Sequence, residues 1–100
     1  MKVIITDHAK FKLKDIYQYY KNIVSSKIAG KVKKDIINKT LSLNKFPFKG
    51  PLEENLKDLN EELRYLVAGN YKIIYYIYQN SIYIIDIFDT RQDPGKMGKL

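Results

Sequence analysis

Three strand-like runs follow one another in the C-terminal part of the sequence, and they constrain the fold more than any other feature. β-Branched and aromatic residues fill these runs, which cover residues 62–67, 72–78 and 81–88. The breaks between them contain Gly69-Asn70 and Gln79-Asn80, residue types that favour tight turns. The pattern therefore predicts a three-stranded antiparallel meander.

Upstream of the meander, a short apolar run at residues 2–5 predicts a first strand. Apolar residues then recur at steps of four and three between residues 9 and 23, which is typical of one face of a helix. Either Thr6 or Asp7 can cap this helix, because both side chains accept hydrogen bonds from free backbone N–H groups. We expect the helix to end near Val24.

A second amphipathic helix is predicted to begin after Ser25 or Ser26 and to be stopped by Pro47. Gly30 lies inside this pattern at a cost of about 1 kcal/mol relative to alanine, unless the two helices approach closely there. The apolar positions of the second helix are Ala29, Val32, Ile36, Ile37, Leu41 and Leu43.

The predicted order is β-α-α-β-β-β, an α+β fold in which an N-terminal helical hairpin packs on one face of an antiparallel sheet. We expect residues 1–100 to form a single domain. In the loop that crosses from helix to sheet, we expect the rings of Phe46 and Phe48 to pack into the core as plugs. Alternation places Ile73, Tyr75 and Ile77 on one face of their strand, and Lys72, Ile74, Tyr76 and Tyr78 on the other. Because neither face is fully polar, we expect another chain to cover part of the second face.

Charge and composition narrow the function classes. The net charge of +7 favours an anionic partner, whether nucleic acid, an acidic protein segment or a membrane surface. The chain has no cysteine, so disulfides and thiolate metal sites are excluded. The apolar stretch 71–88 is interrupted by charged and amide residues, and the N-terminal apolar run is too short for a signal peptide. We therefore expect a cytoplasmic protein that does not enter membranes.

Arginine is the most informative charged residue, because only Arg64 and Arg91 occur among many lysines. A planar, bidentate and permanently charged group suits recognition of a phosphate or carboxylate. The alternative for Arg91 is a surface ion pair with Asp89 or Asp93. The alternative for Arg64 is a stem packed beside the meander, with its head paired to one of the glutamates at 61–62.

Other candidate residues carry weaker signals. His8 has no partner at the spacing of a metal site or a catalytic triad, so we expect a structural or surface role. No residue pattern predicts a metal ion or another cofactor. Tyrosines in the last two strands are interpreted either as stacking platforms for single-stranded nucleic acid or as sheet packing with a polar tip. These tyrosines are Tyr75, Tyr76, Tyr78 and Tyr83.

The order and spacing of several segments carry a family resemblance over nearly the whole chain. These segments are Leu13-x-x-Ile16-Tyr17-x-Tyr19-Tyr20, Phe46-Pro47-x-x-Gly50, Leu63-Arg64-x-Leu66-Val67, Gly69-x-Tyr71-Lys72-Ile73-Ile74-Tyr75 and Ile87-Phe88-Asp89-Thr90-Arg91-Gln92-Asp93-Pro94. Together they make the chain resemble the RelE/ParE superfamily of toxins from type II toxin–antitoxin modules. The long hairpin helices, the Phe-Pro-x-x-Gly turn and an arginine seven residues before the strand tyrosine favour the ParE-like branch.

The resemblance implies the small basic toxin of a plasmid-stabilisation-type module, held in a hetero-oligomer by a cognate acidic antitoxin. ParE members inhibit DNA gyrase, whereas RelE-like members cleave mRNA in the ribosome. By position, Lys72 and Arg91 stand where RelE-like toxins use arginines, and we expect Arg64, Lys72 and Arg91 to bind the target. RelE-like nucleases also use lysines on the preceding strand and a tyrosine after the last arginine, where Met97 lies here.

Three functions follow as hypotheses. The first is a ParE-like toxin that binds a cellular target such as gyrase and performs no chemistry. The second is a ribosome-dependent mRNA endoribonuclease, for which Tyr65 or Tyr71 would need a lowered pKa to replace the missing acid and base. The third is a non-toxic basic binding module with the same fold. The sequence leaves open whether the protein is an enzyme.

Overall fold

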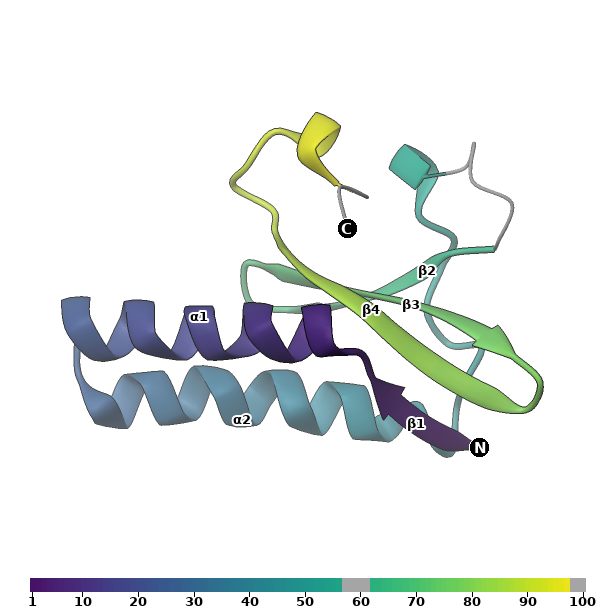
Figure 1. Cartoon of the computed structure of the whole chain (residues 1–100), viewed down its shortest axis with the longest axis horizontal. Coiled ribbons are helices and arrows are strands. Elements are labelled where there is room, and N and C mark those ends of the chain that lie inside the picture. The colour runs from purple at the N-terminus through teal and green to yellow at the C-terminus, as the bar shows by residue number, and fades with distance from the viewer. Residues whose placement is uncertain (57–61, 98–100) are drawn as a thin grey trace.

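The structure is a computed structural model and describes residues 1–56 and 62–97. Helices α1 (Asp7–Ile23) and α2 (Ser26–Ser42) form an antiparallel hairpin beneath a sheet (Figure 1). The Thr6 hydroxyl accepts a hydrogen bond from the backbone of Ala9, and the Ser25 hydroxyl accepts one from Ile28. These two hydroxyls satisfy N–H groups that have no partner inside their own helix. The predicted helical hairpin is therefore confirmed.

The sheet contains β1 (Lys2–Ile5), β2 (Arg64–Ala68), β3 (Tyr71–Tyr78) and β4 (Ser81–Asp89), in the order β1-β4-β3-β2. Strands β2, β3 and β4 form the predicted antiparallel meander. β1 instead runs parallel to β4, so the sheet is mixed and not wholly antiparallel as expected. In the sequence, both helices and strands β2 and β3 lie between β1 and β4, so they form the long connection that a parallel pair requires.

Both tight turns of the meander follow from the residues that form them. Gly69 has a φ of +59° in the turn between β2 and β3. Gln79 and Asn80 have φ values of 46° and 63° in the turn between β3 and β4. Two successive residues with positive φ match the twist of a two-residue hairpin, and asparagine tolerates this conformation better than most residues.

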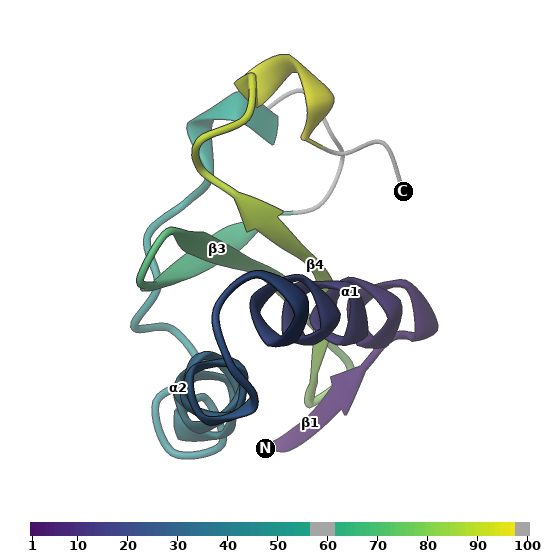
Figure 2. The same ribbon diagram turned by 90° about the vertical axis from the view of Figure 1, so that its left-hand side faces the viewer.

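The main core lies between the helical hairpin and the sheet, with α1 against β4 and α2 against β2. Figure 2 shows the two helices nearly end-on, below β3. The predicted alternation of β3 is confirmed, because Ile73 and Tyr75 are fully buried in this core. Its fully buried members on the other elements include Ala9, Ile36, Leu43, Ile82 and Ile84.

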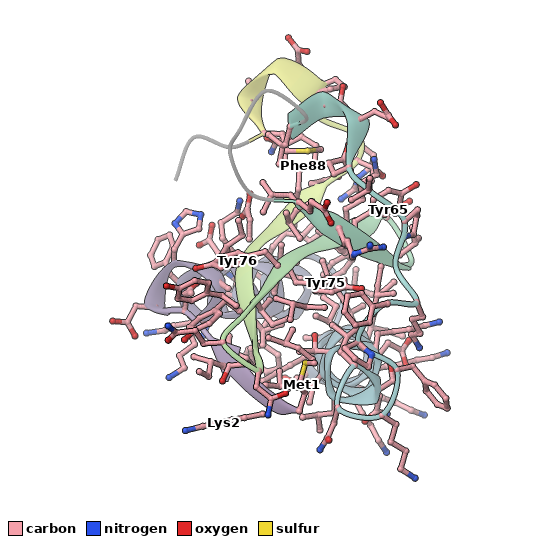
Figure 3. The ribbon with its side chains drawn as sticks, turned by 90° about the vertical axis from the view of Figure 1, so that its right-hand side faces the viewer. Met1, Lys2, Tyr65, Tyr75, Tyr76 and Phe88 are labelled. Atoms are coloured by element: carbon pink, nitrogen blue, oxygen red, sulfur yellow. The ribbon has the colours of Figure 1, made fainter. Side chains whose placement is uncertain are left out.

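The opposite face of the sheet carries a second, smaller core. Two short 3₁₀ helices, η1 (Glu54–Leu56) and η2 (Pro94–Lys96), lie above it (Figures 1 and 2). Figure 3 shows Phe88 beneath them. Part of this face is thus covered by the chain itself, and the expected contribution of another chain stays a prediction. The second core consists of Leu56, Leu63, Ile74, Phe88 and Met97.

The loop after α2 departs most from expectation. α2 ends at Ser42, before Pro47, and Phe46 and Phe48 are 61% and 63% exposed, so they do not plug the core. The backbone of this loop is held instead by Tyr75, whose hydroxyl donates to the Pro47 carbonyl (2.8 Å) and accepts from the Gly50 N–H (3.0 Å). These bonds fix the main chain of the loop, and the two phenylalanine rings face solvent.

Three further positions on the hairpin differ from the sequence-based prediction. Ile23 is 63% exposed because it lies at the end of α1 that extends beyond the sheet, and Leu41 is 54% exposed although its neighbours Thr40 and Leu43 are buried, so Leu41 faces away from the core. A Cβ atom at Gly30 would meet nothing within 4 Å, so no close approach of the helices requires glycine there. Within residues 1–56 and 62–97, no helix is both long enough and apolar enough to cross a membrane.

Candidate target-binding site

A pocket of about 340 Å³ opens between α1 and the C-terminal end of β4. The Thr90 backbone and hydroxyl both donate to the Asn70 carbonyl at 2.8 Å, which ties the end of β4 to the β2–β3 turn. This places Arg91 beside α1. The residues that line the pocket are Lys12, Asp15, Ile16, Tyr19, Tyr71, Ile87, Asp89, Arg91 and Gln92.

Arg91 is held by Asp89 in a two-point ion pair. Its Nε donates to Oδ1 and its Nη2 to Oδ2 of Asp89, each at 2.9 Å, while its backbone N–H also donates to Oδ1 at 2.9 Å. The alternative role for Arg91, an ion pair with Asp89, is thus present in the structure. The hydrogen bond from Arg91 lowers the pKa of Asp89, and Asp89 in turn raises the pKa of Arg91. Both groups are charged at neutral pH.

Tyr71 forms part of the pocket floor. Its hydroxyl donates to the Tyr20 hydroxyl over a long 3.4 Å contact, and the residue is buried. Burial, followed by the hydrogen bond with Tyr20, raises the pKa of Tyr71 well above its ordinary value. A phenolate base needs the opposite shift, so Tyr71 is a poor proton acceptor at neutral pH.

A buried carboxylate beside the pocket was missed from the sequence. Oδ1 of Asp86 lies 2.9 Å from Lys12 Nζ and 3.3 Å from His8 Nε2, and it accepts the Ile87 N–H at 2.8 Å. The pairing orients Lys12, which lines the pocket, whereas His8 Nε2 makes no hydrogen bond within the described residues. The sequence did contain a signal, because Asp86 lies inside an apolar strand. A carboxylate buried in such a strand requires hydrogen-bond or charged partners to compensate it.

Lys72 lies away from this pocket and is already paired. Its Nζ donates to Oε2 of Glu53 at 2.8 Å and lies 4.3 Å from the centre of the Tyr65 ring. The Glu53 side chain is only 1% exposed. Burial alone would raise the pKa of Glu53, but hydrogen bonds from Lys72 and Asn55 outweigh it and keep the pKa below its ordinary value.

Arg64 supports the loop after α2. Its Nη1 donates to the Gly50 carbonyl at 2.8 Å, and its guanidinium carbon lies 5.4 Å from the centre of the Phe48 ring. Arg64 is itself the first residue of β2, and Glu62 makes no ion pair with it within the described residues. The other expected partner, Glu61, lies outside those residues.

The three predicted target-binding residues do not converge on one site. Lys72 pairs in register with Phe88, a residue of the second core, whereas Arg91 lies beside α1 on the helix side. Lys72 and Arg91 therefore lie on opposite faces of the sheet. The tyrosines also divide, since Tyr75 is buried, while the rings of Tyr76 and Tyr83 stack with centres 5.2 Å apart.

The sequence matches the family model described as the ParE toxin of the type II toxin–antitoxin system parDE, over residues 3–94. The chain belongs to the ParE toxin family. A chain of the solved chromosomal ParDE toxin–antitoxin system from P. aeruginosa has a similar fold, with a TM-score of 0.76 and 20% identity. The similarity covers 89% of this chain and 95% of that chain. No curated protein sequence gives a significant match.

In this ParE-family toxin, the Arg91 pocket combines a fixed guanidinium, a lysine and a partly apolar wall. Arg91 and Lys12 can bind a negatively charged group, and Ile16, Tyr19 and Ile87 can contact an apolar one. Among the pocket-lining residues, Asp89 and Arg91 hold each other in the charged form, and the raised pKa of Tyr71 is unfavourable for a base. The arrangement therefore suits binding better than proton transfer.

Proposed function

We propose that this ParE-family toxin inhibits growth by binding a protein target, with DNA gyrase the target that family membership suggests. The observation that supports this most is the separation of Lys72 from Arg91. A phosphate clamped by both residues would have to reach two faces of the sheet, and Lys72 would first have to leave the buried Glu53. Cleavage by 2′-hydroxyl attack also needs a base and an acid, and the raised pKa of Tyr71 does not favour it as a base.

We also propose a cognate acidic antitoxin as the partner that neutralises the toxin in a hetero-oligomer. The net charge of +7 favours an acidic segment, and electrostatic steering makes such an association fast and dependent on salt. Exposed apolar side chains on the hairpin and its loop, such as Phe11 and Phe48, offer anchors for a segment that folds on binding. Co-expression with the adjacent gene is expected to yield a tight complex, and recovery of free protein alone would contradict this proposal.

Two assays run in parallel test the mechanism. In the first, purified toxin is added to gyrase and relaxed plasmid, and we expect loss of supercoiling. In the second, the toxin is added to a translation reaction and mRNA ends are mapped, and we expect no new cut sites. Specific cuts that disappear in the Lys72→Ala, Arg91→Ala double variant would instead establish the ribonuclease hypothesis. Normal growth on expression without an antitoxin would favour the non-toxic binding module.

A further inference from the structure

The Arg91 guanidinium uses only part of its hydrogen-bonding capacity. Its Nε and Nη2 atoms face Asp89, which occupies one bidentate edge of the planar group. The other edge is formed by Nη1 and the second N–H of Nη2, and within residues 1–56 and 62–97 Nη1 of Arg91 donates no hydrogen bond. The Arg91 side chain is 50% exposed, so this second edge can reach a ligand in the pocket or at its rim.

Asp89 fixes the direction of that free edge. Its Oδ1 accepts both the backbone N–H and the Nε–H of Arg91, while Oδ2 accepts Nη2. These three bonds join the carboxylate to both ends of the arginine side chain and restrict its rotamers. The conformational entropy of the Arg91 side chain is therefore already reduced before any ligand binds, so binding loses less of it. Asp89 acts as a positioning residue and leaves one bidentate edge unobstructed.

The charges around the pocket select the kind of anion. Lys12 is paired with the buried Asp86 and Arg91 with Asp89, while Asp15 adds a further negative charge to the pocket lining. A polyanion such as RNA would bring phosphates close to the carboxylates of Asp15 and Asp89, which is unfavourable. A single carboxylate can instead meet the free edge of Arg91. Beside that position, Ile16 and Ile87 offer an apolar surface for an adjoining side chain.

We propose that this pocket binds an acidic peptide segment of a partner protein, with one carboxylate on the free edge of Arg91 and a neighbouring apolar side chain between α1 and β4. Asp89 holds Arg91 ready for this contact. The inference rests on the proposed function, in that the toxin acts and is neutralised through protein contacts. It adds Arg91 as the residue that binds the carboxylate and Asp89 as the residue that positions Arg91. It also adds the surface between α1 and β4 that contacts the apolar side chain.

The test uses 3-phenylpropionate, a small probe with one carboxylate and one apolar ring, and its neutral amide as a matched control. In an NMR titration of the full chain, we expect saturable shifts of the Arg91 Nε–H signal and of the Ile16 and Ile87 methyl signals. The amide is expected to bind about tenfold more weakly, because it lacks the charge-assisted bidentate contact. Arg91→Lys keeps the charge but not the fork, so a similar loss is expected. Equal binding of acid and amide would overturn the proposal.

Asp89→Asn and Asp15→Asn separate positioning from charge. Each variant removes one negative charge from the pocket lining, but only Asp89 holds Arg91. We expect Asp15→Asn to strengthen binding of the carboxylate and Asp89→Asn to weaken it, although asparagine can still accept the backbone N–H. Stronger binding in both variants would show that Asp89 merely masks Arg91 and would overturn its positioning role. Amide spectra of each variant confirm that it is folded.

A further comparison separates this inference from the proposed function. Tighter binding of a short oligouridylate than of an acidic apolar peptide at the same salt concentration would overturn the choice of ligand. Gyrase inhibition that persists in Arg91→Lys, with probe binding lost and a bound antitoxin unaffected, would reject the pocket as a partner site while the proposed function stands. Specific mRNA cleavage by the wild-type toxin would reject the proposed function whatever the probe does.

Discussion

Of the described glycines, Gly50 is the one whose surroundings leave the least space for a side chain. A Cβ atom added there would lie 2.5 Å from the carbonyl oxygen of Tyr65, 2.7 Å from the Tyr75 hydroxyl oxygen and 2.9 Å from Tyr75 Cε1. The first neighbour is backbone of β2, and the ring of Tyr75 is fully buried. Neither can move aside without disturbing the sheet or the core, so Gly50→Ala is expected to be strongly destabilising.

The size of the effect follows from two costs. Forcing a methyl group into a filled site costs about 2 kcal/mol. Displacing the Tyr75 hydroxyl weakens its bonds with Pro47 and Gly50, which adds about 1 kcal/mol. A loss of about 3 kcal/mol in a domain of this size corresponds to a fall in Tm of about 12 °C or more.

Gly30→Ala is the matched control, because the same methyl group there meets no atom within 4 Å. Gly30 lies inside α2, where alanine is expected to stabilise the protein by up to about 1 kcal/mol. Urea and thermal unfolding of both variants, followed by circular dichroism, should therefore give shifts of opposite sign. A Gly50→Ala variant within about 0.5 kcal/mol of wild type would refute the packing described for the loop.

Three further outcomes are expected. Arg91→Ala should weaken growth inhibition while its Tm stays close to that of wild type, since the side chain is half exposed; full toxicity would remove Arg91 from the site. Tyr75→Phe should cost about 2 kcal/mol in urea unfolding, because the buried Gly50 N–H loses its acceptor; an unchanged midpoint would contradict that bond. Glu53→Gln should cost about 2 kcal/mol near neutral pH, less than for a fully buried pair because Lys72 reaches water. The pKa of Glu53 is lowered in the folded state, so its stabilisation is present above the ordinary value of 4.5 and lost as pH falls below it. The difference between wild type and Glu53→Gln should accordingly shrink in acid, and a difference independent of pH would refute the ion pair.

Local patterns were sufficient to predict much of the fold. The helix periodicity, the capping serine and threonine, and the positive-φ turn at Gln79-Asn80 each depend on neighbours in sequence, and each is present in the structure. The parallel pairing of β1 with β4 was not predictable in this way. It depends on contact between Lys2 and Ser81, and strand composition does not encode the direction of such a partner.

The site was harder to predict, because its geometry depends on long-range partners. Arg91 was identified from its rarity, and its pairing with Asp89 could be anticipated because the two residues are close in sequence. Alternation placed Lys72 on the second face of the sheet, but its pairing with Glu53, from a distant loop, was not predictable from the local pattern. The exposure of Phe48 was missed for the same kind of reason, since Tyr75 from β3 fixes the loop.

The pairing of the first strand with the last one has a consequence for the order of folding during synthesis. Until β4 has left the ribosome, β1 has no neighbour and the inner face of α1 has no sheet to cover it. The hairpin can form early from local contacts, but the tertiary structure must wait for contacts distant in sequence, which form slowly. The walls of the Arg91 pocket come from α1 and from β4 with the residues after it, so the pocket cannot exist on a partly made chain. We therefore expect inhibitory activity to appear only after nearly the whole chain has been translated.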